Sequence, residues 1–397
     1  MAGLGSWVFL EVLDRITDLR TDSSWIVWLM PLGGLVLGAA YHYLGGESSR
    51  GSALLIEQVN EPADGAVSTW MPRRMAPFIV LGTWGSQVVG ASVGREGAAI
   101  QMSGSLTDSF ARLIGLRGED RRTLLIASIA GGFGAVFGVP VAGAVFALEV
   151  QSVGRIRYEA IVPALTAAVV GDRIVHGLGY DHPVPVQLDP RIDAWLLLKL
   201  ALAGVCFGLA AAAYVELASW LKRTMSRLVS WPPMRPFIGG VATIGLIALV
   251  GRDYTGMSLP LIDRALEGAA LSFAVFALKI VFTALAIGSS FPGGEVTPLF
   301  VIGATLGAAL AEPLNVSGPL LAAVGFAAVF AAASNTPIAG TIMGVELFGA
   351  GIALPCAVSC TVAFVFSGRR SIYPTQRLTV DKSGRRVARE TTVSPPD

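Results

Sequence analysis

The side chain whose type and surroundings most clearly suggest chemistry is the carboxylate of Glu96. It lies in the run ASVGREGAAIQ, residues 91–101, among glycines and alanines. Gly94 and Gly97 allow the backbone to approach a ligand closely, and the run can then begin a helix. A helix N-terminus gathers unpaired N–H groups and the positive end of the helix dipole, so it binds anions. This segment therefore predicts an anion site that the protein can fill with its own carboxylate.

A second glycine-rich break, PGGEVTP at residues 292–298, contains Glu295 and Thr297. Downstream of each break, a P-x-A-G run is followed six residues after its glycine by a glutamate, at residues 140–149 and 337–346. The two copies are offset by 197 residues (337 − 140). Two halves of one fold are therefore expected. Repeated halves whose interrupted helices point their N-termini at a midplane site are typical of secondary transporters and related channels.

Composition places these motifs inside a membrane protein. Of the 397 residues, 53% are hydrophobic and 14% are charged, whereas in soluble domains about a quarter are charged. The net charge of +1 does not suggest nucleic-acid binding. The three cysteines lie in apolar runs without ligand spacing, which predicts neither a disulfide framework nor a metal site. The connectors contain no nucleophile, metal-ligand set or phosphate loop that would predict an enzyme or a cofactor.

The apolar segments that must position these motifs are numerous, and many are short. Many fall below the about 20 residues that cross a bilayer upright, and glycine and proline interrupt them. Such segments indicate tilted or half-crossing helices, which are tolerated only where protein or a watery cavity covers the broken backbone. The predicted fold class is an all-α integral membrane protein. Residues 25–376 form its transmembrane domain, with repeat halves at about 25–190 and 191–376.

Two flanking segments are predicted outside this domain. Residues 1–24 lack the basic flank and cleavage site of a removable signal, and they are expected to form an amphipathic helix at the membrane interface. Residues 377–397 are polar and are expected to be a disordered tail. The expected location is the lipid bilayer of the cell membrane, which the chain crosses several times.

In GREGAAIQ, PGGEVTPLFVIGATLG and the two P-x-A-G runs, the sequence resembles the CLC family of anion channels and proton-coupled anion antiporters. The similarity extends from about residue 25 to residue 376. It implies a homodimer with one anion pathway per subunit, each subunit built as an inverted repeat of many tilted and re-entrant helices. It also implies that Glu96 occupies the outer anion site when ionised and swings away when protonated. The alternative is a glutamate that merely caps a helix.

The anion-binding candidates that follow from this resemblance are Ser52, Gly94, Arg95, Glu96, Gly97, Glu295, Val296, Thr297 and Tyr373. Ser52 keeps the hydroxyl of the chloride-selective G-S-G-I-P motif, but Ala53 and Leu55 stand where that motif has its second glycine and its proline. Fluoride exporters commonly have Asn or Met at the position of Ser52. A helix-capping role for Ser52 is equally open. Tyr373, in GRRSIYP, resembles the tyrosine whose hydroxyl faces the central anion. Its alternative is a position in the interfacial aromatic belt.

The GGEVTP break, with Val296 where chloride members usually have phenylalanine, resembles the fluoride/proton antiporter branch. Fluoride is small and a strong hydrogen-bond acceptor, so it needs close donors such as the hydroxyl of Thr297. Glu295 is either a proton-handling carboxylate or an acceptor that ties down neighbouring N–H groups. Val150 follows Glu149 where chloride antiporters carry an inner glutamate, and the fluoride branch also lacks that acid.

These features predict a proton-coupled fluoride exporter in which Glu96 competes with the anion. The alternatives are a chloride/proton antiporter, which only Ser52 favours, and a passive anion channel that uses Glu96 as a gate. Glu149 and Glu346 occupy mirrored repeat positions and are interpreted as scaffold carboxylates that hold helix ends, with a role in transport as the alternative. The expected ligands are fluoride or chloride and protons.

Overall fold

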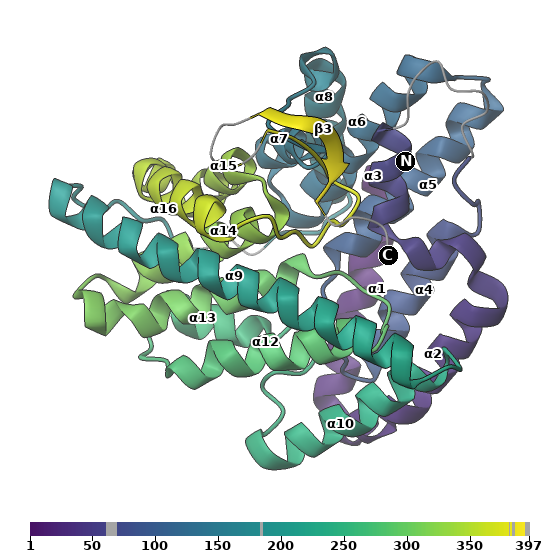
Figure 1. Ribbon diagram of the computed structural model, residues 1–397, viewed down its shortest axis with the longest axis horizontal. Coiled ribbons are helices and arrows are strands. Elements are labelled where there is room, and N and C mark those ends of the chain that lie inside the picture. Colours follow the sequence, from purple (N-terminus) through teal and green to yellow (C-terminus); the bar gives the residue numbers. More distant parts are fainter. Residues whose placement is uncertain (61–69, 183–185, 381, 383–385, 394–397) are drawn as a thin grey trace.

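The computed structural model describes residues 1–60, 70–182, 186–380, 382 and 386–393. Helices account for nearly all of its regular structure (Figure 1). The first-half helices are α1 Ala2–Asp22, α2 Met30–Ala40, α3 Ser52–Asn60, α4 Met75–Val88, α5 Glu96–Leu113, α6 Gly118–Phe137, α7 Pro140–Glu149 and α8 Ile161–Gly177. The second-half helices are α9 Ala194–Leu228, α10 Met234–Val250, α11 Leu259–Leu266, α12 Phe273–Gly288, α13 Val296–Leu314, α14 Gly318–Ser334, α15 Pro337–Phe348 and α16 Ala353–Phe366.

Helix length varies widely, as the interrupted apolar segments predict. Within the residues that the structure describes, four helical stretches are long and apolar enough to cross a membrane: Ser24–Asn60, Tyr158–Gly177, Ala194–Leu228 and Val296–Leu314. Other apolar helices, α7 and α15 among them, have only 10–17 residues. The longest of the described helices, α9, has 35 residues and runs diagonally across the view beside α12 and α13 (Figure 1). The predicted architecture of many helices, several too short to span a bilayer, is confirmed.

Small residues allow neighbouring helices to approach closely. A Cβ atom at Gly303 of α13 would lie 2.1 Å from the carbonyl oxygen of Gly325 in α14, and one at Gly307 would lie 2.0 Å from that of Leu321. Since lipid tails are as apolar as leucine, such close backbone packing is a main source of helix association in a membrane. The glycines of α13 therefore fix this helix, and the glycine-rich break before it, against α14.

A cluster of aromatic rings packs helices of the two halves against each other. Phe133 of α6 stacks on Phe146 of α7 with ring centroids 4.4 Å apart, and both rings contact Phe330 of α14. Phe137 meets Phe300 of α13 edge to face at 5.3 Å. All of these side chains are buried. Offset and edge-to-face ring pairs add packing energy to their buried area, so this cluster is a rigid support for the centre of the molecule.

A small sheet departs from the expected disordered tail. Strand β1, Ser152–Val153, pairs in parallel with β2, Arg377–Val380, which pairs antiparallel with β3, Arg386–Thr392. The prediction of disorder beyond residue 376 was therefore wrong for these two strands. Its physical reason is a pairing partner about 225 residues earlier in the chain: the Arg377 N–H donates to Gln151, and the Thr379 hydroxyl donates to Val153 at 2.6 Å.

The N-terminal segment forms a helix, α1, over Ala2–Asp22. One side of it is buried through Phe9, Leu10 and Leu13, and the indole N–H of Trp84 in α4 donates to the Phe9 carbonyl at 3.2 Å. The helix is therefore a packed part of the bundle. Its position at a membrane interface stays a prediction.

Candidate functional site

The two glycine-rich breaks lie against each other at the centre of the molecule. The N–H of Gly94 donates to the carbonyl of Gly294 at 2.7 Å, and the N–H of Gly294 donates to the carbonyl of Gly94 at 2.9 Å. A Cβ atom at Gly294 would lie 2.3 Å from Oε1 of Glu96, and one at Gly94 would lie 2.5 Å from the same oxygen. A Cβ atom at Gly294 would also lie 2.7 Å from the main-chain nitrogen of Gly97, so glycine is needed there. The pairing of the two breaks sets the N-termini of α5 and α13 side by side.

Glu96, the first residue of α5, extends its carboxylate to the N-terminus of α13. Oε2 accepts a hydrogen bond from the Thr297 hydroxyl at 2.7 Å and one from the Arg95 N–H at 2.9 Å. Oε1 accepts from the N–H of Val296. The side chain is buried, with 1% of its surface exposed. The carboxylate of one half thus occupies an anion position at a helix N-terminus of the other half.

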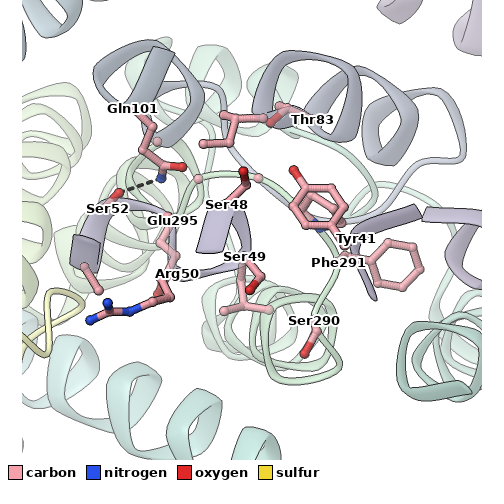
Figure 2. A pocket seen from close by; sticks show the side chains of 18 of the residues that line it. Tyr41, Ser48, Ser49, Arg50, Ser52, Thr83, Gln101, Ser290, Phe291 and Glu295 are labelled. Carbon is pink, nitrogen blue, oxygen red and sulfur yellow. Dashed lines mark hydrogen bonds between the residues drawn. The ribbon is translucent and has the colours of Figure 1, made fainter. Parts of the chain in front are cut away.

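A cavity of about 770 Å³ opens beside this carboxylate. Among the predicted site residues, its lining includes Ser52, Glu96, Gly97, Glu295, Val296 and Tyr373. Figure 2 shows Ser52 and Glu295 at this cavity, next to Gln101. Gly94 packs against the Glu96 carboxylate, and the Thr297 hydroxyl donates a hydrogen bond to it. The guanidinium of Arg95 lies over the Phe137 ring, 5.8 Å from its centroid, so the contribution of Arg95 to the carboxylate is its main-chain N–H.

Ser52 is held by a residue that the sequence reasoning did not single out. Nε2 of Gln101 in α5 donates to the Ser52 hydroxyl oxygen at 2.6 Å, and both residues line the cavity. Gln101 belongs to the same GREGAAIQ run as Glu96, and this membership is the sequence feature that could have identified it as a site residue. With its oxygen engaged as an acceptor, the Ser52 hydroxyl keeps its own hydrogen for another partner.

Glu295 is paired with a tyrosine from α9. The hydroxyl of Tyr214 donates to Oε2 of Glu295 at 2.7 Å, and Tyr214 is fully buried. The acceptor interpretation of Glu295 expected neighbouring N–H donors, whereas the donor in the structure is this hydroxyl from 81 residues away. The sequence signal that could have found it is a single tyrosine in the alanine-rich run of α9.

Glu149 and Glu346 bind helix ends reciprocally. The carboxylate of Glu149, at the end of α7, accepts from the N–H groups of Ile338 and Ala339 at 3.2 and 2.9 Å. That of Glu346, in α15, accepts from Val141 and Ala142 at 2.9 and 2.7 Å. Each glutamate therefore caps the first turn of the other half's helix. The prediction that these two carboxylates hold helix ends is confirmed, and a role in transport stays an untested alternative.

Lys279 of α12 is a second residue that the sequence reasoning missed. Its side chain is fully buried, and Nζ donates to the hydroxyl oxygens of Ser92 and Ser258 at 2.9 Å each and to the carbonyls of Gly256 and Tyr254 at 3.0 and 3.3 Å. Ser92 lies just before the first break. Lys279 therefore anchors the segment that leads into Glu96, and its signal was a lone lysine in an apolar helix.

Paired repeats whose broken helices meet at a buried carboxylate are typical of membrane transport proteins. Residues 33–368 match the family model described as voltage gated chloride channel. The chain belongs to this family, the CLC channels and transporters.

Individual proteins similar to this chain are named for fluoride, for chloride or for both. The chain is 39% identical, over 99% of its length and 88% of the relative's, to a protein of Pseudomonas syringae pv. tomato named chloride/fluoride channel protein. It is 27% identical, over 94% of its length and 86% of the relative's, to the H(+)/Cl(−) exchange transporter ClcA of Vibrio cholerae. A crystal structure of a CLC-type fluoride/proton antiporter superposes with a TM-score of 0.91 and 31% identity, covering 95% of both chains.

Proposed function

We propose that this protein is a proton-coupled fluoride exporter of the cell membrane and that Glu96 is its gate. The observation that supports this most directly is the Glu96 carboxylate at the N-terminus of α13, held by Thr297 and by the N–H groups of Val296 and Arg95. A permeating anion would need the same donors. The ionised carboxylate and the anion therefore exclude each other from this position.

Protonation is the event that exchanges the two. A protonated carboxyl loses its negative charge and turns one oxygen into a donor, so it is a poor partner for a hydroxyl and two N–H groups. Fluoride then takes these donors, and Glu96 leaves with its proton. When Glu96 releases the proton to the opposite side, the carboxylate returns and expels the anion. Each cycle moves a proton and an anion in opposite directions.

Fluoride is favoured over chloride by the kind of donors at the site. The Thr297 hydroxyl and the Val296 N–H converge on one position, and the side chain at residue 296 is small. A small, strongly accepting anion gains most from close donors. The superposed antiporter, named for fluoride, supports the same choice, and the Pseudomonas syringae relative is named for both chloride and fluoride.

A chloride/proton antiporter is the second candidate, and its support is Ser52. The Ser52 hydroxyl lines the cavity and is oriented by Gln101, and the Vibrio cholerae relative is named as a chloride exchanger. The assembly that we propose is a multi-pass homodimer in the lipid bilayer. Exposed apolar side chains along α8, among them Val162, Leu165 and Val169, supply surface suited to lipid or to a partner subunit.

The test is paired recording of anion and proton fluxes in proteoliposomes. An outward fluoride gradient should drive proton uptake against a pH gradient. Chloride transported as fast as fluoride, with the same coupling, would instead select the chloride antiporter. Currents that reverse at the fluoride equilibrium potential whatever the pH gradient would select a passive channel.

A further inference from the structure

The cavity beside Glu96 has a second polar wall that the gate does not use. Three hydroxyl groups lie there, from Tyr41 in the π-helical turn Tyr41–Gly45, Ser48 in the 3-10 turn Gly46–Arg50, and Thr83 in α4. Figure 2 shows Ser48 and Thr83 between Gln101, which bonds to Ser52, and Tyr41. They come from elements that the cavity brings together and not from a single helix end.

Two of these hydroxyl groups are buried and could still donate a hydrogen bond. Ser48 and Thr83 are each 1% exposed, and neither hydroxyl oxygen has a hydrogen-bond partner within the part of the chain that the structure describes. The Tyr41 hydroxyl donates its hydrogen to the Phe78 carbonyl at 2.8 Å, so it offers only lone pairs. A buried hydroxyl without a partner is destabilising, and such a group calls for a specific reason.

The charges around this wall favour an anion over a cation. Lys222 and Arg235 line the same cavity, and so does Arg50, which pairs with Glu47 and Glu57. The carboxylates that line the cavity are Glu96, already bound to the α13 donors, and Glu295, bound to Tyr214. A negatively charged hydrogen-bond acceptor is therefore the ligand that can accept from both hydroxyl groups and pair with the surrounding cations.

We propose that Ser48 and Thr83 form a second fluoride site, where the anion waits before it reaches the donors that Glu96 holds. The identity of the anion rests on the proposed function. The site replaces part of the water around fluoride with two hydroxyl donors, so the ion is partly dehydrated before it competes for the α13 N-terminus. Occupancy of this site does not require Glu96 to move.

The experiment is a fluoride titration of the purified full-length protein by calorimetry, with Ser48→Ala, Thr83→Val and the double variant. Ser49→Ala is the matched control, because Ser49 is exposed and its hydroxyl already donates to the Gly46 carbonyl at 3.0 Å. We expect each single change to weaken one fluoride-binding event about tenfold, as loss of one hydrogen bond to an ion would. The double variant should lose that event, and Thr83→Ser, which keeps the hydroxyl, should retain it.

Two outcomes separate this inference from the proposed function. If the double variant binds fluoride as the wild type and Ser49→Ala do, the hydroxyls hold only water, and the second site is overturned whatever the flux assay shows. If titration with chloride, and not fluoride, loses a binding event in the double variant, the site exists but the proposed fluoride function fails. Repeating the titration in Glu96→Gln should leave the Ser48/Thr83 event in place, since Glu96 does not contact it.

Discussion

Replacing Glu96 with glutamine tests the gate most directly, because the amide has the shape of the carboxylate but neither its charge nor its proton. In the structure the carboxylate accepts three hydrogen bonds, from Arg95, Val296 and Thr297. An amide oxygen accepts at only one of the two positions, and its NH2 group faces donors at the other. The Thr297 hydroxyl can rotate to accept from this group, but a main-chain N–H cannot.

The magnitude follows from these bonds. A hydrogen bond to a charged group contributes about 1.5–3 kcal/mol, and a neutral one contributes about 0.5–1.5 kcal/mol. At least one charged bond is lost outright in Glu96→Gln, and the others weaken. The competitor at the α13 N-terminus is thus weaker by roughly 1.5–3 kcal/mol, which corresponds to about ten- to hundredfold tighter fluoride binding.

Calorimetric fluoride titration measures the affinity of Glu96→Gln, and a pH electrode measures proton uptake in proteoliposomes. We expect tighter fluoride binding together with complete loss of proton coupling. Glu312→Gln is the matched control, since Glu312 is an exposed carboxylate near the other end of α13 and should change neither quantity. Unchanged proton movement in Glu96→Gln would refute the assignment of Glu96 as the proton carrier.

Three further changes probe the supports of the site. Gly294→Ala should abolish transport, because its Cβ would lie 2.3 Å from Oε1 of Glu96 and 2.7 Å from the main-chain nitrogen of Gly97 in the first turn of α5. Gly245→Ala, with open space around its Cβ, should leave flux unchanged, and equal activity of the two variants would contradict the close packing. Lys279→Met should lower the stability of the detergent-solubilised protein by about 1–3 kcal/mol, since four oxygen acceptors lose their donor, and an unshifted thermal transition would argue against this anchor. Tyr214→Phe should release Glu295 to compete with the anion and weaken fluoride binding about tenfold, the value of one hydrogen bond to a charged group; unaltered affinity would mean that the tyrosine does not restrain Glu295.

The parts of this site that the sequence predicts are those that repeat or sit in an unusual local pattern. The 197-residue offset relates Glu149 to Glu346, and their reciprocal caps follow from that symmetry. Glu96 is recognisable because glycines surround a carboxylate in an apolar chain. Local composition was sufficient in each case, since backbone freedom and the cost of a buried charge both act on neighbouring residues.

The parts that the sequence does not predict depend on partners far along the chain. Tyr214 meets Glu295 across 81 residues, and Lys279 meets Ser92 across 187. Tyr214 is the single tyrosine of α9 and Lys279 is the single lysine of α12, and no local pattern identifies the acceptor of either. The prediction missed the strands after residue 376 for the same reason. Strand β2 forms by pairing with Ser152 and Val153, which lie about 225 residues earlier in the chain. Tertiary context decides all three.

In the proposed mechanism, a departure from repeat symmetry distinguishes the gate from the scaffold carboxylates. Glu149 and Glu346 exchange caps, so each carboxylate fills the helix end that it binds. Glu96 makes the equivalent reach to α13, but Glu295 does not return it, because Tyr214 holds its carboxylate. The first turn of α5 instead lines the cavity, through Gly97 and Ala98. In the mechanism that we propose, one helix N-terminus is filled by a carboxylate that moves and the other faces the anion, so a single protonation event is enough to change which site the ion occupies.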